Sequence, residues 1–317
     1  MGRKESGAEP FKWSSFFTAL TSFGLVVLVL GAGAGIVLGM RPLEKRASQL
    51  PGTRATVVDI RWPTVQTTSG ERVTWVPKAE REALTEVATA ALAGDNERFT
   101  GESLQRVGKA MTSSGWFTNT PKIQRVVGGK IQIDGAWRAP AAVVRRDGVD
   151  QLISWDGFPM PVTANVGTTQ FPVIDSPALP APKLAGGATV DFNTAWQGED
   201  IAASLELLAV LLRQPWGSQI GGIDARDFSS TRAMIVTTTF GTRIYWGGRY
   251  NKPALGEVNS EQKIGHLTEL YTKHNRIDAG YPMIYVNNTK LQFNISATAE
   301  ALALRIEAMR EEPVKGE

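Results

Sequence analysis

The longest apolar stretch of the chain runs from Trp13 to Met40 and contains no charged residue. A helix rises about 1.5 Å per residue, so this stretch is long enough to cross the roughly 30 Å hydrocarbon core of a bilayer. A cleaved signal peptide would have a shorter apolar core, and a buried helix of a soluble protein would rarely stay uncharged for so long. The pattern therefore predicts one transmembrane helix over 13–40, after a cytoplasmic tail over 1–12 and before a juxtamembrane linker over 41–55.

Gly31, Gly35 and Gly39 recur every four residues within this stretch and would form one stripe along the helix. Small residues at that spacing allow a second membrane helix to pack closely, although glycine is also generally frequent in membrane helices. Lysine and arginine are nearly balanced on the two sides, so the charges do not decide the orientation. The short segment on one side and the long body on the other favour an extracytoplasmic body.

Beyond the linker, apolar positions recur with the periods of strands and helices, and they predict a β-α-α-β-β domain over 56–142. The two closing strands are joined by Gly128-Gly129, which is typical of a hairpin turn because glycine readily takes positive φ. The expected elements are a strand, a loop, two helices and two strands, over 56–62, 67–70, 78–93, 101–114, 122–127 and 130–136.

The following part, 143–296, is predicted to be a mixed α/β domain with antiparallel strands, and 297–317 a C-terminal helix and tail. The fold class is therefore α+β. Residues 162–187 are rich in proline and glycine, which indicates an interdomain linker or a long loop over a sheet. The expected strands lie over 141–145, 151–155, 220–224, 233–238, 243–246, 281–286 and 290–295, and the helices over 195–213 and 261–274.

Composition excludes several kinds of chemistry. The chain has no cysteine, so disulfides, thiolate metal sites and cysteine nucleophiles are ruled out. Its net charge is only +3, with acidic and basic residues interleaved, which argues against a nucleic-acid-binding surface. The two histidines, His266 and His274, lie too far apart on one predicted helix to share a metal. We expect no metal, no cofactor and no small-molecule substrate.

Catalytic motifs are also missing. Gly128-Gly129-Lys130 superficially resembles a phosphate loop but lacks the upstream glycine and the following serine or threonine. Ser260, His266 and Asp278 have the residue types of a hydrolytic triad without a nucleophile-elbow context, so we interpret them as a coincidence. The sequence therefore predicts a protein that is not an enzyme and acts by binding.

Short motifs follow one another after Phe99: Trp116 comes after an expected helix, and Arg138-Ala139-Pro140-Ala141 comes after the expected hairpin. This order resembles the FtsQ/DivIB family of cell-division proteins, in which a tryptophan follows a helix and an Arg-x-Pro-Val/Ala turn leads into the β-domain. The resemblance extends to about Phe293 and includes the membrane anchor. Further matching motifs lie at 126–133, 152–157, 171–174, 241–247, 261–271 and 276–282.

The chain departs from the family pattern at two places. The arginine that is usual in the Ile-Asp-Leu-Arg-Tyr-Pro entry to the last strands is Gly280 here, and the connection from Trp62 to Trp75 is longer than usual. The chain therefore resembles a divergent member. The resemblance implies a POTRA domain over 56–142 and a β-domain over 143–296.

The resemblance also implies a function. Members of the family are non-catalytic scaffolds of the septum-forming machinery, the divisome, and are anchored in the cytoplasmic (inner) membrane with most of the chain outside the cytoplasm. They bind other single-pass division proteins through POTRA and through an exposed strand edge, which receives small coiled-coil partners of the FtsB and FtsL kind. Carried over, this implies partner contacts at Tyr281, Ile284, Tyr285 and Val286, although Ile284 is as readily assigned to the core.

Another class of protein shares this plan. An envelope-anchored subunit of a secretion or conjugation apparatus would also combine one anchor with an α/β body. A body rich in hairpins that ends in paired strands favours the division scaffold, which we expect at the division site. An enzyme such as a wall hydrolase is the least supported alternative, because the chain has no nucleophile motif.

Overall fold

The computed structural model describes residues 57–67, 69–93, 101–127 and 129–294. The expected membrane helix over 13–40, with Gly31, Gly35 and Gly39, lies outside the described residues, and so does the C-terminal helix over 297–317. Among the helices that are described, none is long and apolar enough to span a membrane.

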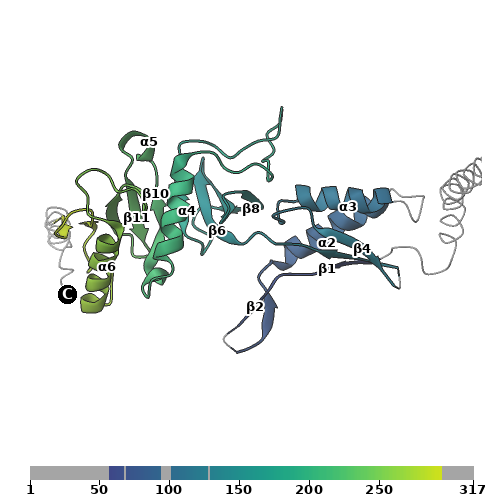
Figure 1. The fold of residues 1–317 in the computed structure, drawn as a ribbon, viewed down its shortest axis with the longest axis horizontal. Helices are drawn as coiled ribbons and strands as arrows, with labels where there is room; N and C mark the ends of the chain where they lie inside the picture. The colour runs from purple at the N-terminus through teal and green to yellow at the C-terminus, as the bar shows by residue number, and fades with distance from the viewer. Residues whose placement is uncertain (1–56, 68, 94–100, 128, 295–317) are drawn as a thin grey trace, which may run out of the picture.

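The structure consists of a small unit, residues 57–138, and a large unit, residues 139–294, each built on a sheet with helices (Figure 1). Both main sheets contain parallel and antiparallel pairs, so the expected mixed α/β fold is confirmed. The small unit contains β1 (Val57–Ile60), β2 (Thr64–Gln66), β3 (Arg72–Thr74), α2 (Lys78–Ala93), α3 (Gly101–Ser113), β4 (Lys122–Val126) and β5 (Lys130–Asp134).

The small unit has the expected order β-α-α-β-β. Its three-stranded sheet has the order β1-β5-β4, with β1 parallel and β4 antiparallel to β5. Leu84 of α2 and Met111 of α3 are buried in one core with Ile131 and Ile133 of β5. The expected loop over 67–70 lies between two strands that the sequence did not predict, β2 and β3, and their hairpin projects from the unit with mostly exposed side chains (Figure 1).

The large unit is built on a nine-stranded sheet of order β14-β13-β12-β11-β10-β9-β6-β7-β8. The expected domain boundary between residues 142 and 143 falls inside β6, whose whole length pairs with β7. The elements are β6 (Pro140–Arg146), β7 (Val149–Ser154), β8 (Pro159–Asn165), β9 (Val173–Asp175), α4 (Glu199–Leu211), η1 (Gly217–Gln219), β10 (Ile220–Asp224), α5 (Phe228–Thr231), β11 (Met234–Thr238), β12 (Arg243–Gly247), α6 (Ser260–His274), β13 (Met283–Tyr285) and β14 (Gln292–Phe293).

The interpretation of residues 162–187 as an interdomain linker is wrong. The strand β8 extends into this stretch, and β9 lies in the middle of the sheet, parallel to both β6 and β10. Ile174 of β9 is completely buried. A strand as short as β9 shows no recognisable alternation of apolar and polar residues. Its place in the sheet is therefore determined by the neighbouring strands with which it pairs.

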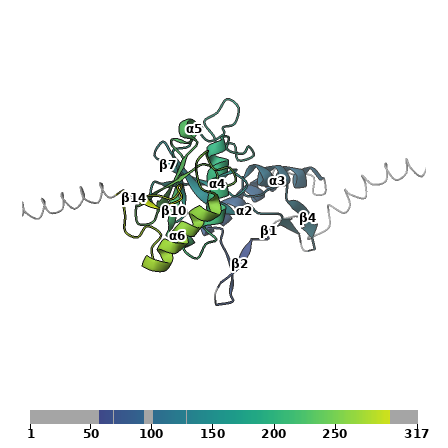
Figure 2. The ribbon, with the colours of Figure 1, turned by 60° about the vertical axis from the view of Figure 1, so that its left-hand side comes forward.

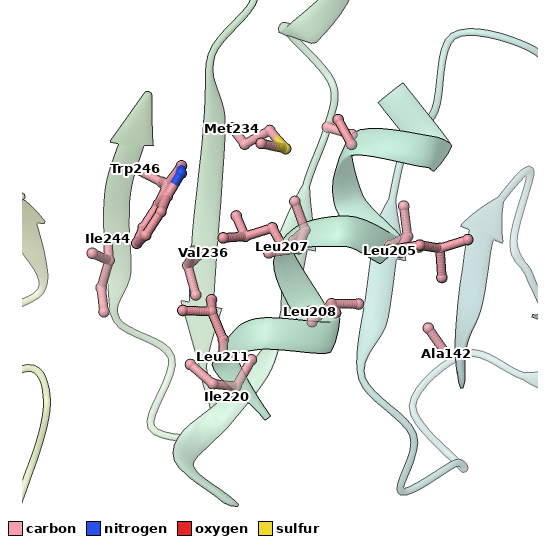
Figure 3. Close-up of a cluster of buried hydrophobic side chains, with 14 of the residues drawn as sticks. Ala142, Leu205, Leu207, Leu208, Leu211, Ile220, Met234, Val236, Ile244 and Trp246 are labelled. Atoms are coloured by element: carbon pink, nitrogen blue, oxygen red, sulfur yellow. The ribbon is translucent and has the colours of Figure 1, made fainter. Parts of the chain in front are cut away.

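Helices α4 and α6 cover one face of this sheet (Figure 1 and Figure 2). Figure 3 shows Leu207 and Leu211 of α4 packed toward Val236, Ile244 and Trp246 of the sheet. We call this the helix-covered face and the opposite side the open face. Because side chains alternate along a strand, the residues between the buried positions of β11, β12 and β13 lie on the open face.

At the β6–β8 end of the sheet, the small unit covers the open face. Val143, Leu152 and Met160 are buried in the same core as Trp116 and Phe117 of the small unit. The two units therefore share a hydrophobic core, and the sheet is shielded on both sides at this end.

Arg138, from the Arg-x-Pro motif, fixes this junction. Its guanidinium is buried, donates hydrogen bonds to the carbonyl oxygens of Gly115 (3.3 Å) and Phe192 (2.7 Å), and lies 4.1 Å from the ring centre of Phe158. Burial lowers the pKa of Arg138, and the carboxylate of Asp156, 3.5 Å away, opposes that shift. One cation thus donates to backbone carbonyl groups from both units.

Candidate interaction surface

The site expected from the sequence is the edge formed by residues 281–286, but β13 is an interior strand. It pairs in parallel with β12 on one side and antiparallel with β14 on the other. Among the described strands, the edge at this end of the sheet is β14, which has only two residues. The backbone edge available to a partner is therefore shifted by one strand from the position expected.

The four expected contact residues do not form one surface. Ile284 and Val286 are completely buried in the core beneath the helices, so their side chains do not face a partner in this structure, and Ile284 takes the core position that was its alternative. Tyr285 points to the open face because side chains alternate along β13. Tyr281 precedes the strand and packs its ring against Phe293 of β14, with ring centres 4.4 Å apart.

The turn that leads into β13 is organised by Asp278, a completely buried carboxylate. Arg276 donates two hydrogen bonds to it, at 2.8 and 2.7 Å, and the backbone N–H of Gly280 donates a third at 3.0 Å. The hydroxyl of Thr242, beside β12, donates to the same carboxylate at 2.7 Å. The network ties the start of β13 to β12 and so fixes the position of Tyr281.

The electrostatics of Asp278 follow from these contacts. Burial is the largest single influence and raises its pKa, but the hydrogen bonds from Arg276, Gly280 and Thr242 together outweigh it. The pKa of Asp278 is therefore lower than usual, and the carboxylate is ionised in the folded protein at neutral pH.

The same turn explains one departure from the family pattern. Gly280 has φ +83°, a left-handed conformation that glycine adopts without strain, and the preceding Ala279 also has positive φ, at 45°. An arginine at position 280 would be strained in this backbone. The sequence at this turn is thus adapted to its local geometry.

The open face near this edge carries an apolar patch. Ile235, Tyr245 and Tyr285 lie in one row across β11, β12 and β13, and Met283 lies two residues before Tyr285. All four are half-buried, and the rings of Tyr245 and Tyr285 are 5.6 Å apart. Burial raises the pKa of Tyr245, with smaller contributions from Glu257 and Tyr285. We call these four residues the open-face patch; within the described part of the chain, no helix packs on them.

Sequence reasoning missed the residues that position this surface. Tyr245 lies in a predicted strand and Thr242 lies just before it. Only the structure shows that Thr242 bonds to Asp278 and that Tyr245 contacts Tyr285. Ser260, His266 and Asp278, interpreted above as a coincidental triad, have separate surroundings in the structure. Ser260 donates to the carbonyl oxygen of Tyr250, and Nδ1 of His266 is buried without a hydrogen-bond partner among the described residues.

A concave feature lies elsewhere, along α4. It is a groove of about 800 Å³ between this helix and the turn after β7, with Trp155 and Trp196 in its lining. Its carboxylates already have partners: Asp156 contacts Arg138, and Glu206 contacts Arg249. Within the described ranges, no group of three His, Cys, Asp or Glu side chains is placed to hold a metal.

No protein-family model matches the chain, and no curated protein is significantly similar to it. The sequence motifs and the geometry described above carry the functional proposal.

Proposed function

We propose that the protein is a membrane-anchored, non-catalytic scaffold of the bacterial cell-division machinery, of the FtsQ/DivIB type. In this proposal the small unit is a POTRA domain, the large unit is the β-domain, and residues 13–40 anchor both outside the cytoplasm at the division site. The partners are small single-pass coiled-coil division proteins.

The observation that carries the proposal is the agreement between motif order and architecture. A β-α-α-β-β unit with a mixed sheet is followed by the Arg-x-Pro motif, and Arg138 of that motif lies at the junction with a large mixed sheet. The family resemblance implies the same succession of units. A secretion or conjugation subunit would share the anchor. The order of motifs, however, resembles that of the division proteins and supplies no argument for such a subunit.

The edge of β14 is the surface that best supports partner binding. On the side away from β13, no described strand pairs with β14, and a partner strand added there would extend the nine-stranded sheet. The ring of Tyr281 packs on Phe293 of this edge strand. The hydrogen-bond network around Asp278 and Thr242 in turn fixes the position of Tyr281. Hydrogen bonds between main chains would supply affinity, and alternate side chains would supply selectivity.

Site-specific photocross-linking in living cells tests this surface. A photoreactive residue replaces Gln292, which is exposed on β14, in the full-length chain. Gln197 is the matched control, because it is an equally exposed glutamine just before α4. We expect position 292 to cross-link to a small single-pass coiled-coil membrane protein and position 197 not to do so.

Localisation of a fluorescent fusion distinguishes the two candidate functions. A division scaffold concentrates at mid-cell before constriction, whereas a secretion or conjugation subunit does not follow the division cycle. A fusion that stays evenly distributed, together with identical cross-linking from positions 292 and 197, would overturn the proposal.

A further inference from the structure

The open-face patch is accessible to a covering element. Ile235, Tyr245 and Tyr285 retain partial exposure although they lie on interior strands, which are paired on both sides. Met283 extends the patch toward β14. Contiguous apolar surface of this kind on a sheet is normally covered by another element of the same chain or by a partner.

The chain leaves the described structure beside this patch. The backbone N–H of Asn294 donates to the carbonyl oxygen of Met283, at 3.2 Å, so the last described residue is hydrogen-bonded to a patch residue. Residues 295–317 follow directly. A segment that starts at this point needs only a short turn to reach the open face.

The sequence of that segment matches such a role. Between Thr298 and Glu311, the apolar residues Ala299, Leu302, Ile306 and Met309 are spaced by three, four and three positions, which places them on one face of a helix. The opposite side would carry three glutamates and Leu304. This is the pattern of a surface helix with one buried stripe.

The dimensions also agree. A helix of fourteen residues is roughly 21 Å long at 1.5 Å per residue. Four neighbouring strands span about 14 Å at a spacing near 4.8 Å. Residues 298–311 are therefore long enough to cross the patch from β14 to β11, and 295–297 provide the connection.

We propose that residues 298–311 form an amphipathic helix that packs on the open-face patch of their own chain, with Leu302 and Ile306 against Tyr245 and Tyr285. The inference goes beyond the scaffold function and does not depend on it. The large sheet then has helices on both faces at this end, and Tyr245 and Tyr285 are shielded by the chain itself.

Cysteine cross-linking in the full-length chain tests the proposal directly, because the protein has no cysteine of its own. Thr237→Cys places one thiol on the open face, since Thr237 follows Ile235 by two residues on β11. It is combined with Ile306→Cys on the apolar stripe, or with Leu304→Cys on the opposite side as the matched control. Met283→Cys serves as a second open-face position in the same two combinations.

With a short bifunctional maleimide, we expect intramolecular cross-links from Ile306→Cys at several times the yield obtained from Leu304→Cys. Equal yields from the two positions would overturn the proposal. Cross-links that join two chains, or that join this chain to another protein, would assign the patch to a second copy or to a partner and would also overturn it.

Hydrogen exchange gives an independent measurement on the same chain. Replacing both Leu302 and Ile306 with Glu should release the helix and raise exchange at β12 and β13 by about fivefold or more, while Leu304→Glu should leave it unchanged. Exchange that is unchanged in the double variant would show that residues 298–311 do not cover these strands.

Discussion

The two ends of the nine-stranded sheet differ on the same face. At the β6–β8 end, Val143 and Leu152 are buried under Trp116 of the small unit. At the β11–β14 end, Tyr245 and Tyr285 occupy the open face and remain half-exposed. One sheet face is thus covered at one end, while at the other end the described residues leave it accessible.

The side chains at the two ends reflect this difference. At the covered end, the buried residues Val143, Leu152 and Met160 are apolar and gain from complete removal from water. The accessible end combines Ile235 and Met283 with two tyrosines, whose rings favour an apolar contact while the hydroxyl group can stay hydrated. The two ends of one sheet face therefore differ in residue chemistry as well as in exposure.

The largest effect is expected at the covered end, from Arg138→Ala. The change leaves the carbonyl oxygens of Gly115 and Phe192 without their buried donor and leaves Asp156 without its cation. We expect the free energy of unfolding to fall by about 3 kcal/mol, measured by urea denaturation with tryptophan fluorescence. Arg138→Lys, which keeps the charge but not the planar fork, should lose less. An unchanged midpoint would show that Arg138 does not hold the two units together.

An intermediate effect is expected at the accessible end, from Asp278→Asn. The variant weakens charge-assisted hydrogen bonds from Arg276, so stability at neutral pH should fall by about 2 kcal/mol.

The pH dependence gives this prediction a sign. Because the folded-state pKa of Asp278 is lowered, its contribution is complete above the unfolded value, about 3.9, and is lost as pH falls toward the folded value. Denaturation midpoints measured from pH 6 down into this acidic range should therefore fall less steeply for Asp278→Asn than for the parent. Identical slopes would mean that the carboxylate is not stabilised by this network.

The smallest effect is expected on the open face itself, from Tyr245→Ala and Tyr285→Ala. The rings are in register on adjacent strands and 5.6 Å apart, so a double-mutant cycle should give a coupling of about 0.5–1 kcal/mol. A coupling near zero would indicate that each ring packs independently. A much larger value would show that this end is a core like the other one.

Much of the fold could be predicted because its patterns are local. The strands β1, β4 and β5 and the helices α2 and α3 follow from alternation or helical spacing over consecutive residues. Between the expected strands over 141–145 and 151–155, Asp147 and Gly148 have the positive φ values of a tight hairpin turn. The hairpin β2–β3 was not predictable in this way, because exposure on both sides removes the alternation on which a strand assignment depends.

The candidate site was predictable only in its position along the chain. Alternation correctly separates Tyr285 from Ile284, but one sequence does not tell which of the two faces the helices cover. That β14 rather than β13 forms the edge depends on pairing between distant segments. The role of Asp278 likewise depends on Thr242, a residue far away in sequence that folding brings within hydrogen-bond distance.

The central position of β9 has a consequence for how the sheet assembles in time. This three-residue strand is the only described connection, through main-chain hydrogen bonds, between the β6–β7–β8 meander and the strands β10 to β14. Both of its pairings are parallel and join segments that are far apart in the sequence, and such pairings form slowly because the entropy of closing the intervening chain must be lost first. Each half can form early from local contacts, and docking of Val173–Asp175 between them is the step that makes the sheet continuous.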